Sequence, residues 1–146
     1  TNGGNTWSVV FDSTITLSGY IENPAEIFIN PVNPQIVLVA SKAGMHRTIN
    51  GGISWTQTLN FECFDVKAKS DNPNILYTVR RNEATNTHQF LTSVDSGITW
   101  TPQTTGWYNS TNPSRTAVGA RIAVSAADSN RIYAYLIGDS KPGDNG

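Results

Sequence analysis

Several carboxylates of this chain could take part in the hydrolysis of a glycosidic bond. That reaction needs two facing carboxyl groups at a defined separation. The candidates are Asp12, Glu22, Glu26, Glu62, Asp65 and Glu83. Sequence spacing does not give the distance between two side chains, so it places no catalytic pair. For Asp65, which lies in an apolar run, we favour a hydrogen-bonded structural role because buried charges are normally paired.

The sequence gives little support for a metal site or a nucleophile. His46 and His88 have no second histidine at metal-ligand spacing, and no Ser or Cys lies in a nucleophile motif. Oxygen-rich turns at Asn2, Asn50 and Asp95 would suit calcium. Two of these three side chains carry no charge, and such turns satisfy their own hydrogen bonds. We therefore predict no metal and no cofactor.

A polar loop in the segment 104–119 carries adjacent aromatic residues, Trp107 and Tyr108, followed by Asn109. Exposed rings beside Asn and Arg donors can stack on a sugar or grip a peptide. The alternative is that Trp107 folds back and caps its own sheet. We give this alternative somewhat more weight, because large aromatic side chains are mostly buried.

The elements that must position these residues are indicated by a turn that occurs three times. Each copy places Asn or Asp, Gly and a hydroxyl residue just before a tryptophan. The copies end at Trp7, Trp55 and Trp100, which are 55 − 7 = 48 and 100 − 55 = 45 residues apart. This spacing is typical of one four-stranded propeller blade. The Asn or Asp can accept backbone N–H groups, and the glycine supplies a conformation closed to other residues.

The repeated turn resembles the Asp-box, or bacterial neuraminidase repeat, whose form is Ser-x-Asp-x-Gly-x-Thr-Trp. Residues 93–100 match every fixed position, 48–55 carry conservative replacements, and the first copy lacks the opening residue. The residues assigned to the boxes are Asn2, Gly4, Thr6, Trp7, Thr48, Asn50, Gly52, Ser54, Trp55, Ser93, Asp95, Gly97, Thr99 and Trp100. We interpret them as scaffold, with each tryptophan ring buried at the start of a strand and Trp55 and Trp100 in equivalent places.

A second pattern between the boxes predicts strands. Turns near Asn33, Asn72 and Asn130 each precede a run of β-branched and aromatic residues, and another short apolar stretch lies upstream of each turn. The sequence therefore predicts an all-β fold of four-stranded antiparallel meanders, the blades of a β-propeller. Within one domain, 1–146, we expect the last strand of one blade (7–11), whole blades near 24–59 and 61–103, and half of a further blade near 120–137.

Propellers close with about four to eight blades. We therefore expect this chain to be a fragment of a longer propeller, whose remaining blades are its partners.

Composition narrows the classes of partner. Charged residues make up 14% of the chain and hydrophobic residues 38%, which suits a water-soluble, turn-rich β protein. The net charge of −1 gives no electrostatic footprint for nucleic acid, and no segment has the length of apolar sequence that a membrane span needs. Cys63 is the only cysteine, and its apolar run favours a buried free thiol over pairing with a cysteine elsewhere.

The resemblance implies where a ligand would bind. In propellers of this kind, two sets of strand connections gather on one face, while the boxes lie at the opposite, outer rim. The candidate ligand-binding residues on that face are Glu62, Arg80, Arg81, Trp107, Tyr108 and Asn109. Residues 45–48 lack the Ile-Pro of the sialidase motif, which argues against a sialidase. The Asn-Pro-x-Ile strand followed by an Asp-box looks like the sortilin-like and xyloglucanase-like branch.

We predict a non-catalytic propeller segment of a secreted or cell-surface protein that binds a polypeptide or a glycan through its loop face. The alternative is part of a propeller glycoside hydrolase whose catalytic carboxylates are split between this segment and missing blades. A fold hosts many functions, so the choice depends on the site.

Overall fold

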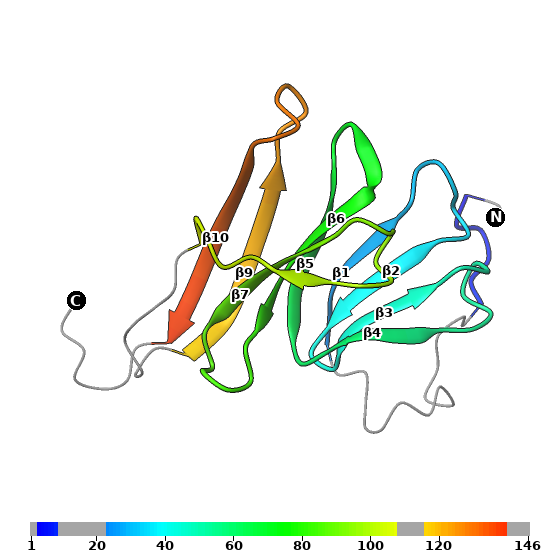
Figure 1. Ribbon diagram of the computed structural model, residues 1–146. Helices are drawn as coiled ribbons and strands as arrows, with labels where there is room; N and C mark the ends of the chain where they lie inside the picture. Colours follow the sequence, from blue (N-terminus) through cyan, green and yellow to red (C-terminus); the bar gives the residue numbers. More distant parts are fainter. Residues whose placement is uncertain (1–2, 9–22, 108–115, 140–146) are drawn as a thin grey trace.

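The computed structural model describes residues 3–8, 23–107 and 116–139, and these residues form strands and turns (Figure 1). The strands of the described residues form three antiparallel sheets, which lie side by side. None of the described residues forms a helix that could span a membrane. The predicted all-β fold of four-stranded meanders is confirmed.

The first sheet has the strand order β1-β2-β3-β4. Its strands are β1 (Pro24–Ile29), β2 (Val37–Ser41), β3 (Gly44–Thr48) and β4 (Thr56–Asn60). The hairpin between β2 and β3 depends on Gly44, whose φ of 133° lies in a region that other residues rarely adopt. A Cβ there would lie 2.0 Å from the carbonyl oxygen of Leu59 on β4. Gly44 therefore allows β4 to approach this hairpin.

The second sheet repeats this meander in the order β5-β6-β7-β8. Its strands are β5 (Cys63–Lys69), β6 (Asn72–Arg81), β7 (His88–Ser93) and β8 (Thr101–Pro102). The third sheet consists of the pair β9 (Thr116–Val124) and β10 (Ile132–Asp139). Among the described residues, β10 pairs with β9 alone, so its other edge is open.

Apolar side chains fill the two spaces between neighbouring sheets. Between the first and second sheets, a buried cluster includes Leu38, Met45 and Leu76. Between the second and third sheets, another cluster includes Phe64, Tyr77 and Ile122. Burial of such side chains contributes about 1.5–3 kcal/mol each. The inner strands β1, β5 and β9 contact one another in this order, which sets the sheets side by side around one axis.

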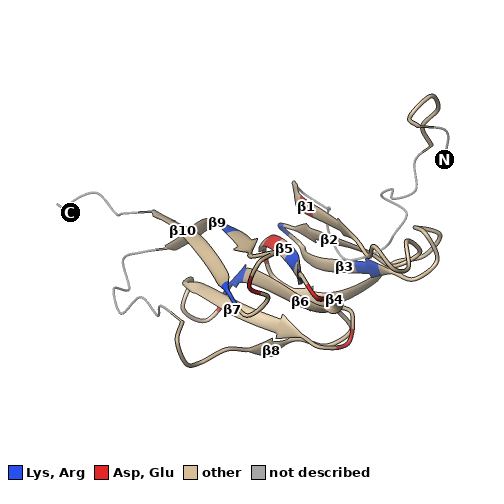
Figure 2. Ribbon diagram, turned by 90° about the horizontal axis from the view of Figure 1, so that it is seen from above, with Lys and Arg blue, Asp and Glu red and all other residues tan. Residues whose placement is uncertain are grey.

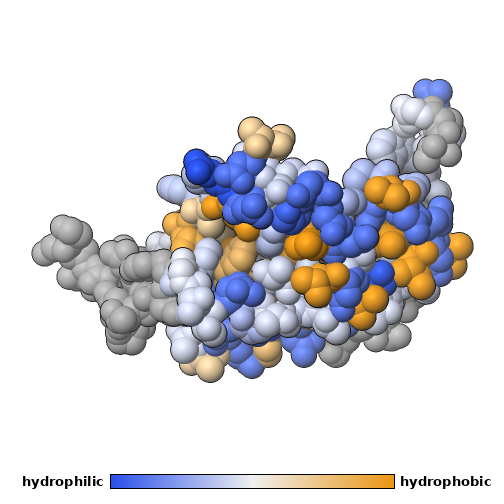
Figure 3. Space-filling view, turned by 45° about the horizontal axis from the view of Figure 1, so that its top comes forward, coloured by the Kyte–Doolittle hydropathy of each residue, from blue (hydrophilic) through white to orange (hydrophobic). Residues whose placement is uncertain are grey.

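The three repeated turns share one backbone conformation. Two successive residues have positive φ in each turn: 67° and 86° at residues 3 and 4, 66° and 96° at residues 51 and 52, and 60° and 82° at residues 96 and 97. We call residues 48–55 and 93–100 the box turns. Aliphatic side chains at their variable positions are exposed, and Figure 3 shows orange side chains gathered at this end of the molecule.

The tryptophans that follow the turns are less buried than predicted. Trp7 is 91% exposed, because no described strand lies against it. Trp55 is half-buried and donates its indole N–H to the carbonyl oxygen of Gly52, 3.1 Å away in its own turn. Trp100 is half-buried between the first and second sheets and donates to Thr58 Oγ1 at 3.2 Å. Trp55 and Trp100 are thus both half-buried, but their indole N–H groups have different acceptors.

Candidate ligand-binding face

The box turns and the candidate ligand-binding residues lie at opposite ends of the strands. The box turns contact the hairpins that join the first two strands of each sheet, as in the bonds from Gly51 N to Gln35 O (3.0 Å) and from Ser96 N to Asn74 O (2.9 Å). The β4–β5 and β6–β7 connections lie at the other ends of these strands, along the lower edge of Figure 1. We call residues 60–62 and 80–89 the loop face.

Glu62 and Arg81 join the two connections of the loop face. The Arg81 backbone N–H donates to the Glu62 carbonyl oxygen at 2.8 Å, and the two side chains form an ion pair of 2.6 Å. Arg81 Nε also donates to the carbonyl oxygen of Ala117 on β9 at 3.0 Å. Two predicted ligand-binding residues are thus brought together, and Arg81 also ties the second sheet to the third.

Arg80 lies over the ring of Phe61, with 5.9 Å between the guanidinium carbon and the ring centroid. Arg80 Nε donates to Gln89 Oε1 at 2.9 Å, and its Nη1 lies 3.4 Å from the carbonyl oxygen of Asn60. These contacts hold the guanidinium in place over the aromatic ring. The structure therefore places Arg80 beside Phe61, an aromatic residue of the loop that was not among the predicted site residues.

Phe61 combines exposure with an unusual backbone. Its side chain is 37% exposed, and its φ is 68°, a conformation that costs a bulky residue about 1–3 kcal/mol. Glycine or asparagine would fit the same turn with less strain. A strained aromatic residue kept at the surface points to a functional role. No sequence pattern carried this signal, because φ at a loop residue depends on the strands on either side.

Trp107 adopts the second of the two arrangements considered from the sequence, in which it caps its own sheet. Its ring stacks on Phe90 with centroids 5.1 Å apart and an angle of 24°. Its indole N–H donates to the carbonyl oxygen of His88 at 3.2 Å. Trp107 is half-buried, so it does not form an open platform beside Arg80. Tyr108 and Asn109 lie outside the described residues.

Three of the four described candidate carboxylates have partners within the fold. Asp65 is fully buried, and its two oxygens accept the backbone N–H groups of Val66 and Ile122, each at 2.8 Å. It therefore joins β5 to β9, as expected for a structural carboxylate. Glu26 and Glu62 are in ion pairs, and Glu83 is exposed. The remaining two candidates, Asp12 and Glu22, lie outside the described residues.

Lys67 completes an ionic link between two inner strands. Its ammonium lies 2.7 Å from Glu26 Oε1 on β1 and 3.3 Å from Asp65 Oδ1 on β5. Burial lowers the pKa of Lys67, but the hydrogen bond to Glu26 and the negative charge of Asp65 outweigh burial, so the pKa is raised overall. The charged residues near the axis thus hold sheets together. Figure 2 shows the Lys, Arg, Asp and Glu residues of the described part of the chain scattered over its strands and turns.

The histidines and the cysteine have ordinary places in strands. His46 is buried on β3, and burial lowers the pKa of its imidazole. His88 Nε2 lies 2.7 Å from the carbonyl oxygen of Gly119. Cys63 is a buried free thiol whose pKa is raised by burial to about 12. Within the described residues, no group of His, Cys, Asp or Glu could hold a metal ion.

The box turns satisfy their own polar groups. Asp95 accepts from the N–H groups of Ile98 and Thr99 and from the hydroxyls of Thr99 and Ser93, at 2.6–3.1 Å. Burial raises the pKa of the Asp95 carboxyl, but the bonds from Thr99, Ser93 and Ile98 outweigh burial and lower the pKa to about 2. Asn50 accepts in the same way from Thr48 Oγ1 and from the Ser54 N–H. Such turns position strands and leave little capacity for a ligand.

The fold and the two ends of the strands define a segment of β-propeller blades. No protein-family model matches the chain, and no curated protein matches it. Among solved structures, an ancestral GH74 enzyme is similar over 81% of this chain, with 19% sequence identity and a TM-score of 0.60. A GH74 xyloglucanase from Xanthomonas campestris is similar over 66% of this chain, with 17% identity and a TM-score of 0.48.

The chain spans 16% of the length of each of these two enzymes. At 19% identity, the likeness to the ancestral enzyme shows the propeller fold alone.

Proposed function

We propose that this chain is part of an Asp-box propeller of the sortilin-like and xyloglucanase-like branch, in a secreted or cell-surface protein. We further propose that it binds a glycan through the loop face without cleaving it. The observation that carries this proposal is Phe61, a strained aromatic residue held at the surface under the guanidinium of Arg80.

The surroundings of Phe61 suit a sugar. Carbohydrates present C–H groups that pack on aromatic rings, and hydroxyl groups that need charged or amide partners. Such partners are close by. Glu62 follows Phe61 in the chain and forms an ion pair with Arg81 from the neighbouring connection, and the Gln89 side chain accepts a hydrogen bond from Arg80. The side chains of Arg81 and Glu62 are 35% and 23% exposed, so both remain accessible to water and to a ligand.

A glycan array probed with this chain tests the proposal, with Arg80→Ala as the test variant. Arg131→Ala is its matched control, because it removes the same charge from the β9–β10 turn at the other ends of the strands. We expect one class of glycan to bind, to lose binding with Arg80→Ala and to keep it with Arg131→Ala. Binding to a peptide array alone would show that the ligand is a polypeptide and not a glycan. No binding to either array would contradict the proposal.

The enzyme alternative has support in the fold, because the similar solved structure with the higher TM-score is an enzyme. It would require a second carboxylate opposite one of the loop-face carboxylates. Of the described candidates, Glu26 and Glu62 are in ion pairs, Asp65 accepts backbone N–H groups in the core, and Glu83 is exposed. Because the alternative divides its catalytic pair between this segment and further blades, the test uses the longer protein. Incubation of that protein with the glycan that the chain binds should release no new reducing ends. Release that disappears with Glu62→Gln would establish the alternative.

A further inference from the structure

A groove of about 440 Å³ opens between the second and third sheets. Phe90, Gln103 and Trp107 form one wall, and Ile132, Ala134 and Leu136 of β10 form the other. The groove is distinct from the loop face, because its walls come from the outer part of the second sheet and from the outer strand of the third. A corresponding space lies between the first and second sheets.

The corresponding space between the first and second sheets is filled by Trp100. Its ring packs against the buried cluster that includes Leu38, Met45 and Leu76, and its indole N–H donates to Thr58 Oγ1 on β4. The turn before Trp100 also lies against this cluster, because a Cβ on Gly97 would lie 2.4 Å from the Leu38 side chain and 3.3 Å from the Leu76 side chain. Trp100 and its turn therefore close the outer part of the space between these sheets.

The internal repeat relates the two spaces residue by residue. The box turns are offset by 100 − 55 = 45 positions, so Phe90 corresponds to Met45 and Gln103 corresponds to Thr58. The Asn74 N–H donates to Asn72 Oδ1 and the Asn130 N–H donates to Asp128 Oδ1. The turns that begin at Asn72 and Asp128 are therefore offset by 128 − 72 = 56 positions, so Ile132 of β10 corresponds to Leu76 of β6. The walls of the groove are thus the counterparts of the residues around Trp100.

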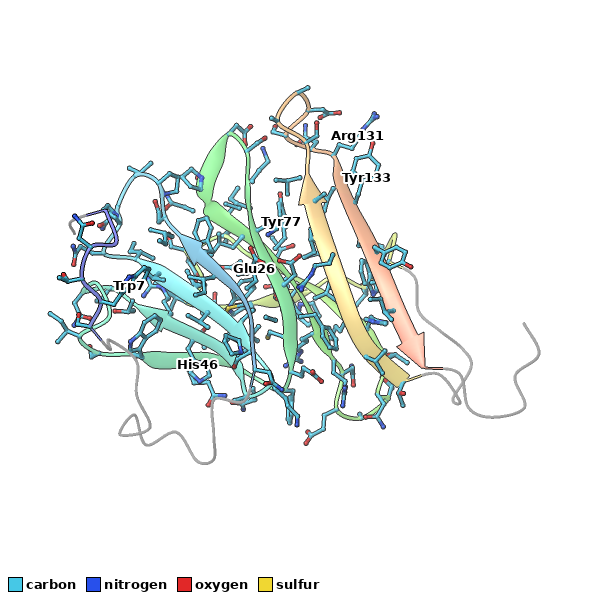
Figure 4. The ribbon with its side chains drawn as sticks, turned by 180° about the vertical axis from the view of Figure 1, so that it is seen from behind. Trp7, Glu26, His46, Tyr77, Arg131 and Tyr133 are labelled. Carbon is cyan, nitrogen blue, oxygen red and sulfur yellow. The ribbon has the colours of Figure 1, made fainter. Side chains whose placement is uncertain are left out.

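Among the described residues, the edge of β10 that faces away from β9 has no partner strand, and it lies next to this groove. In the second sheet, the strand that corresponds to β10 is β6, and its second edge pairs with β7, the strand that leads to Trp100. The free edge of β10 offers the same ladder of N–H and C=O groups, which a strand from outside can complete. Figure 4 shows this strand, marked by Tyr133, at the opposite end of the molecule from Trp7.

We propose that the groove binds the tryptophan of a further box hairpin, contributed by the remaining blades of the same protein. A box hairpin consists of two strands joined by a box turn. The first strand of that hairpin pairs with the free edge of β10. Its tryptophan enters between Phe90 and Ala134, and the Gln103 side-chain oxygen accepts the indole N–H, as Thr58 does for Trp100. This assignment is independent of the glycan proposal, because it uses none of the residues of the loop face that carry it.

A peptide taken from this chain is the probe. Residues 88–104 contain both strands of a box hairpin and its turn, and 5-fluorotryptophan in place of the tryptophan gives a ¹⁹F NMR signal from the peptide alone. We expect the signal to shift when the chain is added. A peptide with alanine in place of this tryptophan should bind at least about tenfold more weakly, because a buried tryptophan dominates such contacts.

Two neighbouring residues of β10 provide matched variants of the chain. Ala134→Arg fills the groove and should weaken peptide binding at least about tenfold. Tyr135→Arg places the same charged side chain on the other face of β10, where Tyr135 is 70% exposed, and should leave binding unchanged. Circular dichroism of both variants checks that the sheets still form. If Ala134→Arg disrupts folding, Gln103→Ala serves as the groove variant, with a smaller loss.

Three results would overturn the proposal. The first is the absence of a ¹⁹F shift at millimolar peptide. The second is binding that is equally strong for the peptide without tryptophan or for the groove variants. The third is self-association of the chain, measured by analytical ultracentrifugation, that is lost in both Trp7→Ala and Ala134→Arg, because it would assign the groove to a second copy.

Discussion

The two ends of the strands differ in how their polar groups are used. At the box turns, the Asp95 oxygens and the Ser93 hydroxyl are engaged by groups of the same turn. At the loop face, Phe61 is kept at the surface in a strained conformation beside Arg80. Residues that satisfy one another inside a turn support folding, whereas a strained, exposed ring needs another reason to be retained. This difference is the basis of our proposal that the box turns support folding and the loop face supports recognition.

The largest expected effect is on folding and comes from Trp100→Ala. Its ring is half-buried rather than fully buried, so we expect a loss of about 2–4 kcal/mol, somewhat below the range for a fully buried ring. Urea denaturation followed by circular dichroism measures this loss. Trp7→Ala is the control, because a ring that is 91% exposed should contribute less than about 0.5 kcal/mol. Equal losses for the two variants would contradict the assigned packing.

A smaller loss is expected for Asp95→Ala. Removal of the carboxylate leaves the N–H groups of Ile98 and Thr99 without their acceptor, which should cost about 1–3 kcal/mol. Val94→Ala, in the same turn, changes an exposed side chain and should have almost no effect. An Asp95→Ala variant that keeps normal stability but loses glycan binding would show that the box turn belongs to the binding site.

Acidification should reduce the contribution of Asp95 in this turn to the free energy of unfolding. The pKa of Asp95 is about 2 in the folded chain and 3.8 in its ordinary state. Its contribution to stability is therefore complete above pH 3.8 and is lost as the pH falls toward 2, because the unfolded state binds the proton more tightly. In Asp95→Asn, the unfolding free energy should depend less on pH over this interval. An unchanged pH dependence in denaturation curves would show that the carboxylate is not held as described.

The sequence predicted the sheets but not the place of each aromatic ring. Turn chemistry is local, so the positive φ values at residues 51, 52, 96 and 97 follow from Asn, Asp, Gly and Ser in the repeats. The burial of a ring depends on what packs against it. Trp7 has no described strand beside it, whereas Trp100 reaches across to Thr58. The repeat pattern contains no information about this difference.

The candidate site was predicted only in part, because side-chain packing between loops cannot be read from local sequence. The family resemblance placed the loops of Glu62, Arg80 and Arg81 on one face, and the structure brings the β4–β5 and β6–β7 connections together. Their ion pair and the position of Arg80 over Phe61 depend on side-chain packing between the two loops. Phe61 was missed because only its backbone conformation distinguishes it from an ordinary loop residue.

The most direct test is to measure stability and glycan binding together for Phe61→Gly. Glycine adopts a φ of 68° without strain, so the variant should be as stable as the parent chain or more stable by about 1 kcal/mol. It should bind the glycan identified on the array at least about tenfold more weakly, as calorimetric titration would show. Full binding by a stable Phe61→Gly chain would contradict the assignment of recognition to the loop face.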